Sequence, residues 1–266
     1  MVDAPALFIE SLDSAPLREL RYLNARRGGG TETLRLPLLS GRARGLPEGV
    51  DALIATSDLQ GIVPDPRTRE STLLGVAVAE WLAELGDEGV IPRGPRCGVI
   101  LAGDLYSVPE ANKRGGYGDV SEVWSAFGER FRWVVGVAGN HDDVAGVGVS
   151  DDVRLLDGER VAMEGLTIAG VGYVSGDTAK RGRRDEDDQI ASIELVTEGG
   201  VDVLALHEGP HGDEGQPGNA RVRAAVEGRV GLTVCGHTHW ERPLAAWDGG
   251  QALNVDGRVV LLRRAR

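Results

Sequence analysis

The five histidines of this 266-residue chain gather in three short segments rather than scattering along it. The segments are GNHD at 139–142, HEGPH at 207–211 and GHTH at 236–239, and an apolar run precedes each. Two more apolar runs end in an aspartate, Asp58 in SDLQG and Asp104 in GDL. Imidazole, carboxylate and amide ligands without thiolate favour Mn, Fe, Zn or Ni over Ca or a structural zinc. These residues therefore predict a metal centre.

The apolar runs that carry these polar ends read as β-strands. Nearly continuous apolar runs are typical of strands that are buried on both faces. In open α/β sheets the ligand-binding site usually lies at the carboxyl ends of the strands. We therefore expect the polar ends of these runs to lie close together. The five expected strands are residues 51–58, 97–104, 131–142, 201–209 and 230–239.

The spacing within two of these ends also suits a common site. Residues i and i+2 of an extended segment point the same way, so Asp58 and Gln60 are expected to face one side. The same holds for His237 and His239. A glycine stands immediately before a candidate ligand at three positions, where it lets the backbone turn and approach closely. These glycines are Gly103, Gly139 and Gly236.

Segments between the apolar runs complete an α/β pattern. Helical periodicity predicts helices over 69–86, 119–131 and 185–199. Turn signals within 153–174 predict a short antiparallel meander. The tail 251–262 carries another Asp-Gly turn and is expected to close a sheet edge. We expect a single domain over residues 1–266, in which residues 1–50, broken by three glycines, are an N-terminal extension of open placement.

Composition bounds the possible partners. The net charge of −12 argues against a broad nucleic-acid surface, which needs an extended basic face. The N-terminus lacks the pattern of a signal peptide and no apolar stretch reaches 18 residues, so a cytoplasmic protein without a membrane partner is expected. Cys97 and Cys235 are expected to be reduced core thiols. Oligomeric state is not indicated.

The order of the motifs resembles the calcineurin-like metallophosphoesterases. GD at 103–104, GNHD at 139–142, a strand-end His207 and GHTH at 236–239 carry the resemblance, which runs from about Asp58 to His239. It implies a four-layer αββα sandwich, with two mixed β-sheets face to face and helices outside. It also implies a phosphoesterase that hydrolyses a phosphomonoester or phosphodiester through a dinuclear metal centre and a bridging hydroxide.

The resemblance assigns roles to residues that match the family motifs. Two divalent ions are implied, Mn being the expected one, with Fe, Zn, Ni and Mg open. His141 would contact the phosphate and help to stabilise or protonate the leaving oxygen, and Asp142 would hold the His141 imidazole. The first ion would be bound by Asp58, Gln60, Asp104 and His239, and the second by Asp104, Asn140, His207 and His237.

Gln60 departs from the family pattern, which has histidine there. A glutamine oxygen is a neutral, harder and weaker ligand, so the first ion is expected to bind more weakly and to favour Mn or Mg over Zn. A non-catalytic scaffold with the same fold and a weakened metal site is the alternative function. His211 competes with His207 as the ligand, and otherwise is expected on the rim of the site.

The substrate is expected to be a small phosphorylated molecule. Residues 105–118 have the composition of a loop over the site but do not match the family's common continuations after GD. Tyr106 and Tyr117 in that loop could stack on a base, although loop packing is the simpler interpretation. KRGRR at 180–184 reads as a solvated loop before a helix, with phosphate binding as the alternative.

Overall fold

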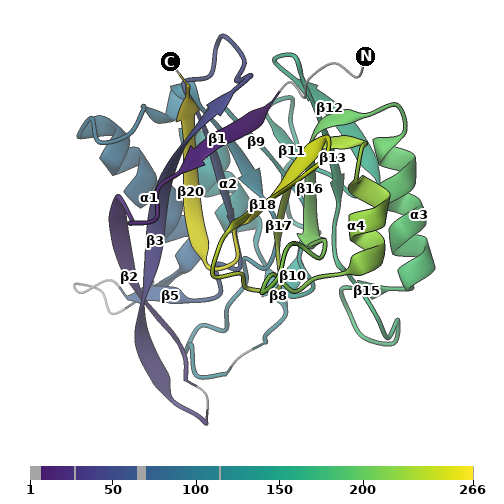
Figure 1. Ribbon diagram of the computed structural model, residues 1–266. Coiled ribbons are helices and arrows are strands. Elements are labelled where there is room, and N and C mark those ends of the chain that lie inside the picture. The colour runs from purple at the N-terminus through teal and green to yellow at the C-terminus, as the bar shows by residue number, and fades with distance from the viewer. Residues whose placement is uncertain (1–6, 27, 65–69, 114, 266) are drawn as a thin grey trace.

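The chain folds as a mixed α/β protein, in agreement with the predicted class. Figure 1 shows the computed structural model, which describes residues 7–26, 28–64, 70–113 and 115–265. The described residues include four α-helices and two large mixed sheets. The helices are α1 (Leu74–Asp87), α2 (Ser121–Arg130), α3 (Glu186–Thr197) and α4 (Ala220–Val226), with a 3₁₀ turn at Gly94–Arg96.

The larger sheet joins segments from both ends of the chain. In spatial order it contains β11 (Val153–Leu155), β9 (Trp133–Gly136), β7 (Cys97–Leu101), β4 (Ala52–Ser57), β20 (Arg258–Arg264), β3 (Thr31–Arg44), β2 (Arg18–Ala25), β5 (Ile62–Pro64) and β6 (Ser71–Leu73). β1 (Phe8–Leu12) also pairs with β3. Strands β4, β7 and β9 are mutually parallel, so their carboxyl ends share one edge.

The smaller sheet contains the strand that carries His207 and the strand that precedes His237. Its order is β12 (Glu159–Met163), β13 (Leu166–Val171), β16 (Val201–Glu208), β17 (Val230–Gly236), β19 (Gly250–Asn254) and β18 (Leu244–Trp247). β16 and β17 are parallel neighbours, which places His207 beside the GHTH segment. Two short parallel pairs complete the description, β8 (Gly118–Asp119) with β10 (Asp142–Asp143), and β14 (Val174–Ser175) with β15 (Arg183–Arg184).

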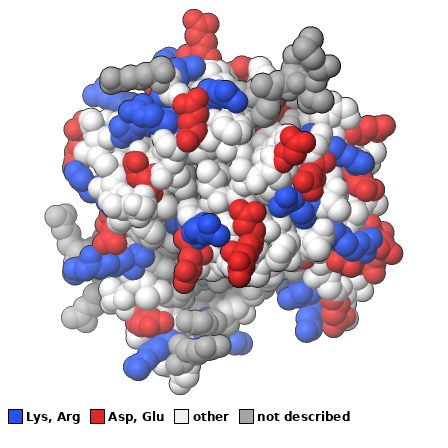
Figure 2. Space-filling model, in the orientation of Figure 1, with Lys and Arg blue, Asp and Glu red and all other residues white. Residues whose placement is uncertain are grey.

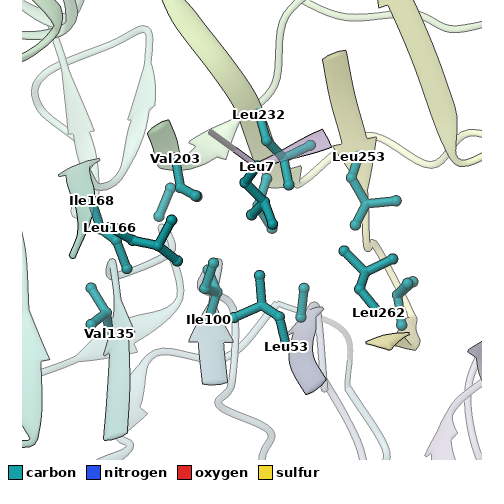
Figure 3. Packing of buried hydrophobic residues seen from close by; sticks show 14 of the residues in the cluster. Leu7, Leu53, Ile100, Val135, Leu166, Ile168, Val203, Leu232, Leu253 and Leu262 are labelled. Atoms are coloured by element: carbon teal, nitrogen blue, oxygen red, sulfur yellow. The ribbon is translucent and has the colours of Figure 1, made fainter. Parts of the chain in front are cut away.

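The core lies between the two sheets and beneath the helices. In Figure 3, Val203, Leu232 and Leu253 of the smaller sheet face Leu53 and Ile100 of the larger one. A second cluster joins α1 and α2 to the larger sheet, and a third joins α3 and α4 to the smaller sheet. Successive residues of one strand supply different clusters, as strand geometry requires. The apolar runs are continuous because their strands are buried on both faces.

The predicted strands and helices are largely confirmed. Each of the five expected strands contains an observed strand. The polar end lies in the loop that follows, except that His207 is near the end of β16 itself and Asp142 begins β10. The second and third predicted helices begin and end within two residues of expectation. The first begins later, because residues 71–73 form β6, and its predicted start at residue 69 lies outside the described residues.

Two sequence-based expectations about the rest of the chain differ from the structure. Residues 153–174 are not one meander: β11 pairs parallel with β9, whereas β12 and β13 form a hairpin of the other sheet. Strand β20 does not close an edge but lies between β4 and β3. The sequence leaves the placement of residues 1–50 open, and their described part belongs to the larger sheet, where β3 pairs with both β2 and β20.

Charged side chains of both signs lie on the surface, and both cysteines are buried. On the face shown in Figure 2, basic and acidic side chains are interspersed rather than segregated. Within the described ranges, no helix is both long enough and apolar enough to cross a membrane. Cys97 and Cys235 are free and buried, as predicted, and burial raises the pKa of each thiol to about 12.

Candidate metal centre

Close contacts join the strand ends at the predicted site, both within the larger sheet and between the two sheets. The amide of Asp58, after β4, donates to the carbonyl of Gly103, after β7, at 2.9 Å. A Cβ on Gly139 would lie 2.1 Å from Oδ1 of Asp104, and one on Gly236 would lie 2.3 Å from Oδ2 of Asp58. Glycine is therefore required at these positions by close approach to the two aspartates, as the sequence predicted.

Three candidate ligands adopt a left-handed backbone conformation. Asp58 and Asp104 have φ of 54°, and His237 has φ of 65°. This conformation is unfavourable for residues other than glycine and is concentrated at functional sites in proteins. It also overturns the expectation of extended geometry, because β4 ends at Ser57 and β17 ends at Gly236. The residues at i and i+2 therefore do not share a strand face.

Asp104, His207 and His237 form the centre of the site. One potential ligand atom of each residue lies within 4.8 Å of the corresponding atoms of the other two. Nε2 of the fully buried His207 is 3.3 Å from Oδ1 of Asp104, and the imidazole rings of His207 and His237 are 5.1 Å apart between centroids. Nδ1 of His207 lies 2.8 Å from the carbonyl of Ala102, which leaves Nε2 to face the carboxylate.

Two buried polar atoms of the set expected to bind the second ion make no hydrogen bond of good geometry. They are Oδ1 of Asn140 and Nε2 of His207, and the latter has the Asp104 carboxylate as its charged neighbour at 3.3 Å. Asn140 lies beside the centre because the next amide, that of His141, donates to Oδ1 of Asp104 at 2.9 Å. An unsatisfied buried polar group is costly, and a divalent cation would satisfy both atoms. The residues present therefore fit a metal ion at this position.

The residues expected to bind the first ion are arranged differently. Gln60 donates from Nε2 to Oδ2 of Asp104 at 3.0 Å, and Oδ2 of Asp58 accepts from the backbone amide of His237 at 3.0 Å. His239 is directed to other partners, since its Nδ1 lies 3.2 Å from Oδ1 of Asp256. Among described residues, the structure groups only three of the predicted His and Asp ligands, and His239 is outside that group.

Asp142 does not hold the His141 imidazole, contrary to expectation. Its buried carboxylate accepts from the amides of Leu105, Tyr106 and Gly139, so it fixes the turns around Asp104. The carbonyl of Gly116 instead lies 2.5 Å from Nδ1 of His141, and Nε2 of that ring is 3.9 Å from Oδ2 of Asp104.

Loop residues not predicted as ligands enclose Asn140 and His141. Gly116, in the expected overhanging segment 105–118, holds the His141 ring. Gly182, in KRGRR, packs so closely that a Cβ there would lie 2.5 Å from Cα of Asn140. Arg181 of the same loop lies over the ring of Tyr117 at 5.1 Å, which links the two loops. The basic segment 180–184 is therefore a neighbour of the site rather than a remote solvated loop.

The sequence-based search missed partners that lie outside the motifs. Asp256 and Arg258 contact His239, and the carbonyls of Ala102 and Gly116 orient two histidine rings. Backbone carbonyls leave no signal in residue identity, and Asp256 reads as an ordinary Asp-Gly turn. His211, the alternative ligand, is exposed, and its backbone forms hydrogen bonds with Asn219 and Arg223.

Burial and neighbouring charges shift the pKa values of the residues at the centre. Desolvation raises the pKa of Asp58 to about 8, opposed by His207 and increased by Asp256 and Asp104. Burial lowers the pKa of His207, but the negative charges of Asp104 and Asp58 outweigh it and raise the value to about 10. Burial raises the pKa of Asp104, but the same histidine and His141 bring it down to about 2.

These shifts predict how pH acts on stability when a chelator removes divalent metal. The folded state retains protons on His207 up to about pH 10, whereas the unfolded chain loses them near pH 6.5. Asp58 adds to this effect up to about pH 8. The free energy of unfolding is therefore expected to fall as pH rises from 6.5 to 10, as urea denaturation at several pH values would measure. His207→Gln should flatten this slope, and an unfolding free energy that rises over that range would contradict the assignment.

Comparisons with known proteins do not indicate a function. No family model and no curated protein matches the chain. Among solved structures, a hypothetical protein from Thermus thermophilus is similar, with 15% identity, a TM-score of 0.48 and coverage of 78% of this chain and 76% of that one. A protein of unknown function from Aquifex aeolicus has 14% identity and a TM-score of 0.37, covering 79% of this chain and 95% of that one.

Proposed function

We propose that the protein is a metal-dependent phosphoesterase acting on a small phosphomonoester or phosphodiester. The observation that carries the proposal is the convergence of Asp104, His207 and His237, beside an Asn140 oxygen that is buried without a partner. Carboxylate, amide and imidazole ligands suit Mn, the expected ion, and also Fe, Zn or Ni. The motif order along the chain supports the phosphoesterase assignment over other metal-dependent reactions.

We also propose that the two sheets and their helices form the four-layer αββα sandwich implied by the motifs. Three buried clusters support this arrangement, because one lies between the sheets and each of the others joins a helix pair to one sheet. Such a sandwich has a functional consequence, since it places the ends of β7 and β9 opposite those of β16 and β17. Ligands from both sheets then meet at one edge.

Each residue of the proposed site has a defined task. Asp104, Asn140, His207 and His237 would hold a divalent ion, which supplies Lewis acidity and lowers the pKa of water. Asp142 fixes the turns that present Asp104 and Asn140, through three backbone amides. His141 is anchored by Gly116 through Nδ1, so Nε2 remains available to donate a proton to the leaving oxygen.

Turnover of model esters by metal-loaded protein tests the proposal. Protein stripped with chelator and reloaded with Mn is expected to hydrolyse p-nitrophenyl phosphate, the bis-p-nitrophenyl diester, or both, and to lose the activity when chelated again. The ratio of the two rates decides between monoesterase and diesterase. Mn binding without turnover of either ester would reject the enzyme and favour the alternative, a non-catalytic binding protein of the same fold.

His141→Gln separates proton transfer from metal binding. A positioned general acid contributes about 10²- to 10⁴-fold, so kcat should fall by that factor. The number of Mn ions bound per chain should not change, because His141 is outside the metal-binding group. His211→Gln is the matched control, since this exposed histidine contacts its neighbours through the backbone and should leave kcat unaltered. Equal kcat in both variants would remove His141 from the reaction.

A further inference from the structure

Arg258 places a fixed positive charge against His239. The residue begins β20 and is 5% exposed, which is rare for arginine. Its Nη2 lies 3.2 Å from Nδ1 and 3.1 Å from Nε2 of His239, and it also donates to the carbonyl of Trp240 at 2.6 Å. Its Nε donates to the carbonyl of Asp256 at 3.2 Å, so backbone acceptors hold the guanidinium in place.

This guanidinium opposes an ion on His239. A histidine binds metal through Nδ1 or Nε2, and Arg258 lies close to both atoms. Arginine stays charged at any relevant pH, so an ion on either nitrogen would lie beside a permanent cation. The guanidinium is buried while the His239 side chain is 59% exposed, so the two charges would repel each other across a partly solvated contact. Arg258 thus supplies at this position the positive charge that a first ion would otherwise bring.

The other members of the first-ion set are also engaged. Oδ2 of Asp104 accepts an N–H from Gln60, which uses one of its lone pairs. With its N–H side on the carboxylate, the Gln60 amide directs its carbonyl oxygen away from Oδ2. Oδ2 of Asp58 accepts from Ser57 Oγ at 2.7 Å and from the amide of His237. Through this oxygen Asp58 positions His237.

We propose that this chain binds one divalent ion, at Asp104, Asn140, His207 and His237, and that Arg258 and Gln60 take the place of the second. The inference rests on the proposed metal centre but not on ester hydrolysis. It assigns opposite roles to the two histidines of one GHTH segment, since His237 is a ligand and His239 is a partner of Arg258 and Asp256.

Mn stoichiometry in His237→Ala and His239→Ala tests the assignment. Equilibrium dialysis of metal-stripped full-length protein against Mn, followed by elemental analysis, is expected to give one ion per wild-type chain. His239→Ala should keep that ion with the wild-type dissociation constant. His237→Ala should bind it more than about 100-fold more weakly, because loss of an outer partner of a ligand already costs about 10- to 100-fold. The 59% exposure of the His239 side chain makes its replacement safe for folding.

The possible results separate this inference from the proposed function. Two Mn ions per wild-type chain, or loss of an ion in His239→Ala, would overturn the one-ion assignment and leave the phosphoesterase proposal standing. No bound Mn in the wild type would reject the metal centre itself. The double variant Gln60→His with Arg258→Gln tests whether a second ion site can be created. This double variant restores an imidazole and removes the guanidinium, so it should bind a second ion, visible in the same dialysis and in the electron paramagnetic resonance spectrum of coupled Mn.

Discussion

Asp104→Asn is expected to abolish metal binding and ester hydrolysis together. Asp104 is 3% exposed, supplies the negative charge nearest His207 and accepts the His141 amide and the Gln60 side chain. An asparagine of the same shape removes that charge. Because loss of an outer partner alone costs about 10- to 100-fold in affinity, loss of this ligand should exceed ~100-fold. Mn dialysis and p-nitrophenyl ester turnover measure the two effects.

Asp143→Asn is the matched control for this prediction. Asp143 lies in the neighbouring short strand β10, and its Oδ1 accepts from the amide of Ala145, away from the metal-binding group. The control should bind Mn and turn over esters as the wild type does. A variant at Asp104 that retained tight Mn binding would show that the ion is bound elsewhere in the chain.

Gly139→Ala is expected to have the largest effect on folding. A single methyl group there would lie 2.1 Å from Oδ1 and 2.2 Å from the backbone nitrogen of Asp104. The turn cannot relax easily, because the Gly139 amide is bonded to the buried carboxylate of Asp142 at 2.8 Å. Overpacking of this kind costs about 3 kcal/mol or more when backbone must move. Urea denaturation measures the loss, and the displaced Asp104 should also weaken Mn binding.

Gly148→Ala provides the comparison for this second prediction. No atom lies within 4 Å of the Cβ that would be added there, and its φ is outside the left-handed range. Its unfolding free energy should equal that of the wild type or rise slightly through reduced freedom of the unfolded chain. Equal stability of the two alanine variants would mean that the contact between Gly139 and Asp104 is not tight in solution.

The sequence revealed the strands and motif ends because their signals are local. A strand such as β7 is buried on both faces, so its apolar run is continuous and its polar end stands out. Long-range pairing leaves no such signal. The Asp157-Gly158 turn was recognised, but nothing in it says that the strands on either side belong to different sheets. The central position of β20 could have been suspected from its run of four apolar residues, Val259–Leu262.

In the candidate site, too, local features were predictable from the sequence and the three-dimensional arrangement was not. Residue types and order predicted Asp104, Asn140, His207 and His237 because metal-binding chemistry restricts which side chains can serve. The direction of each side chain depends on backbone conformation, which the sequence does not indicate. The left-handed φ of His237 places the next histidine of the motif on another path, toward Arg258. In the sequence this arginine looks like an ordinary polar residue at the start of a strand. Its burial and its contact with His239 are visible only in the structure.

Anomalous diffraction from crystals grown with Mn would locate the bound ion in the structure. One anomalous peak per chain is expected, bounded by Asp104, Asn140, His207 and His237, with His239 facing Arg258 and not the ion. A peak bounded by a different set of residues, or Mn-saturated crystals with no peak at this position, would contradict this assignment.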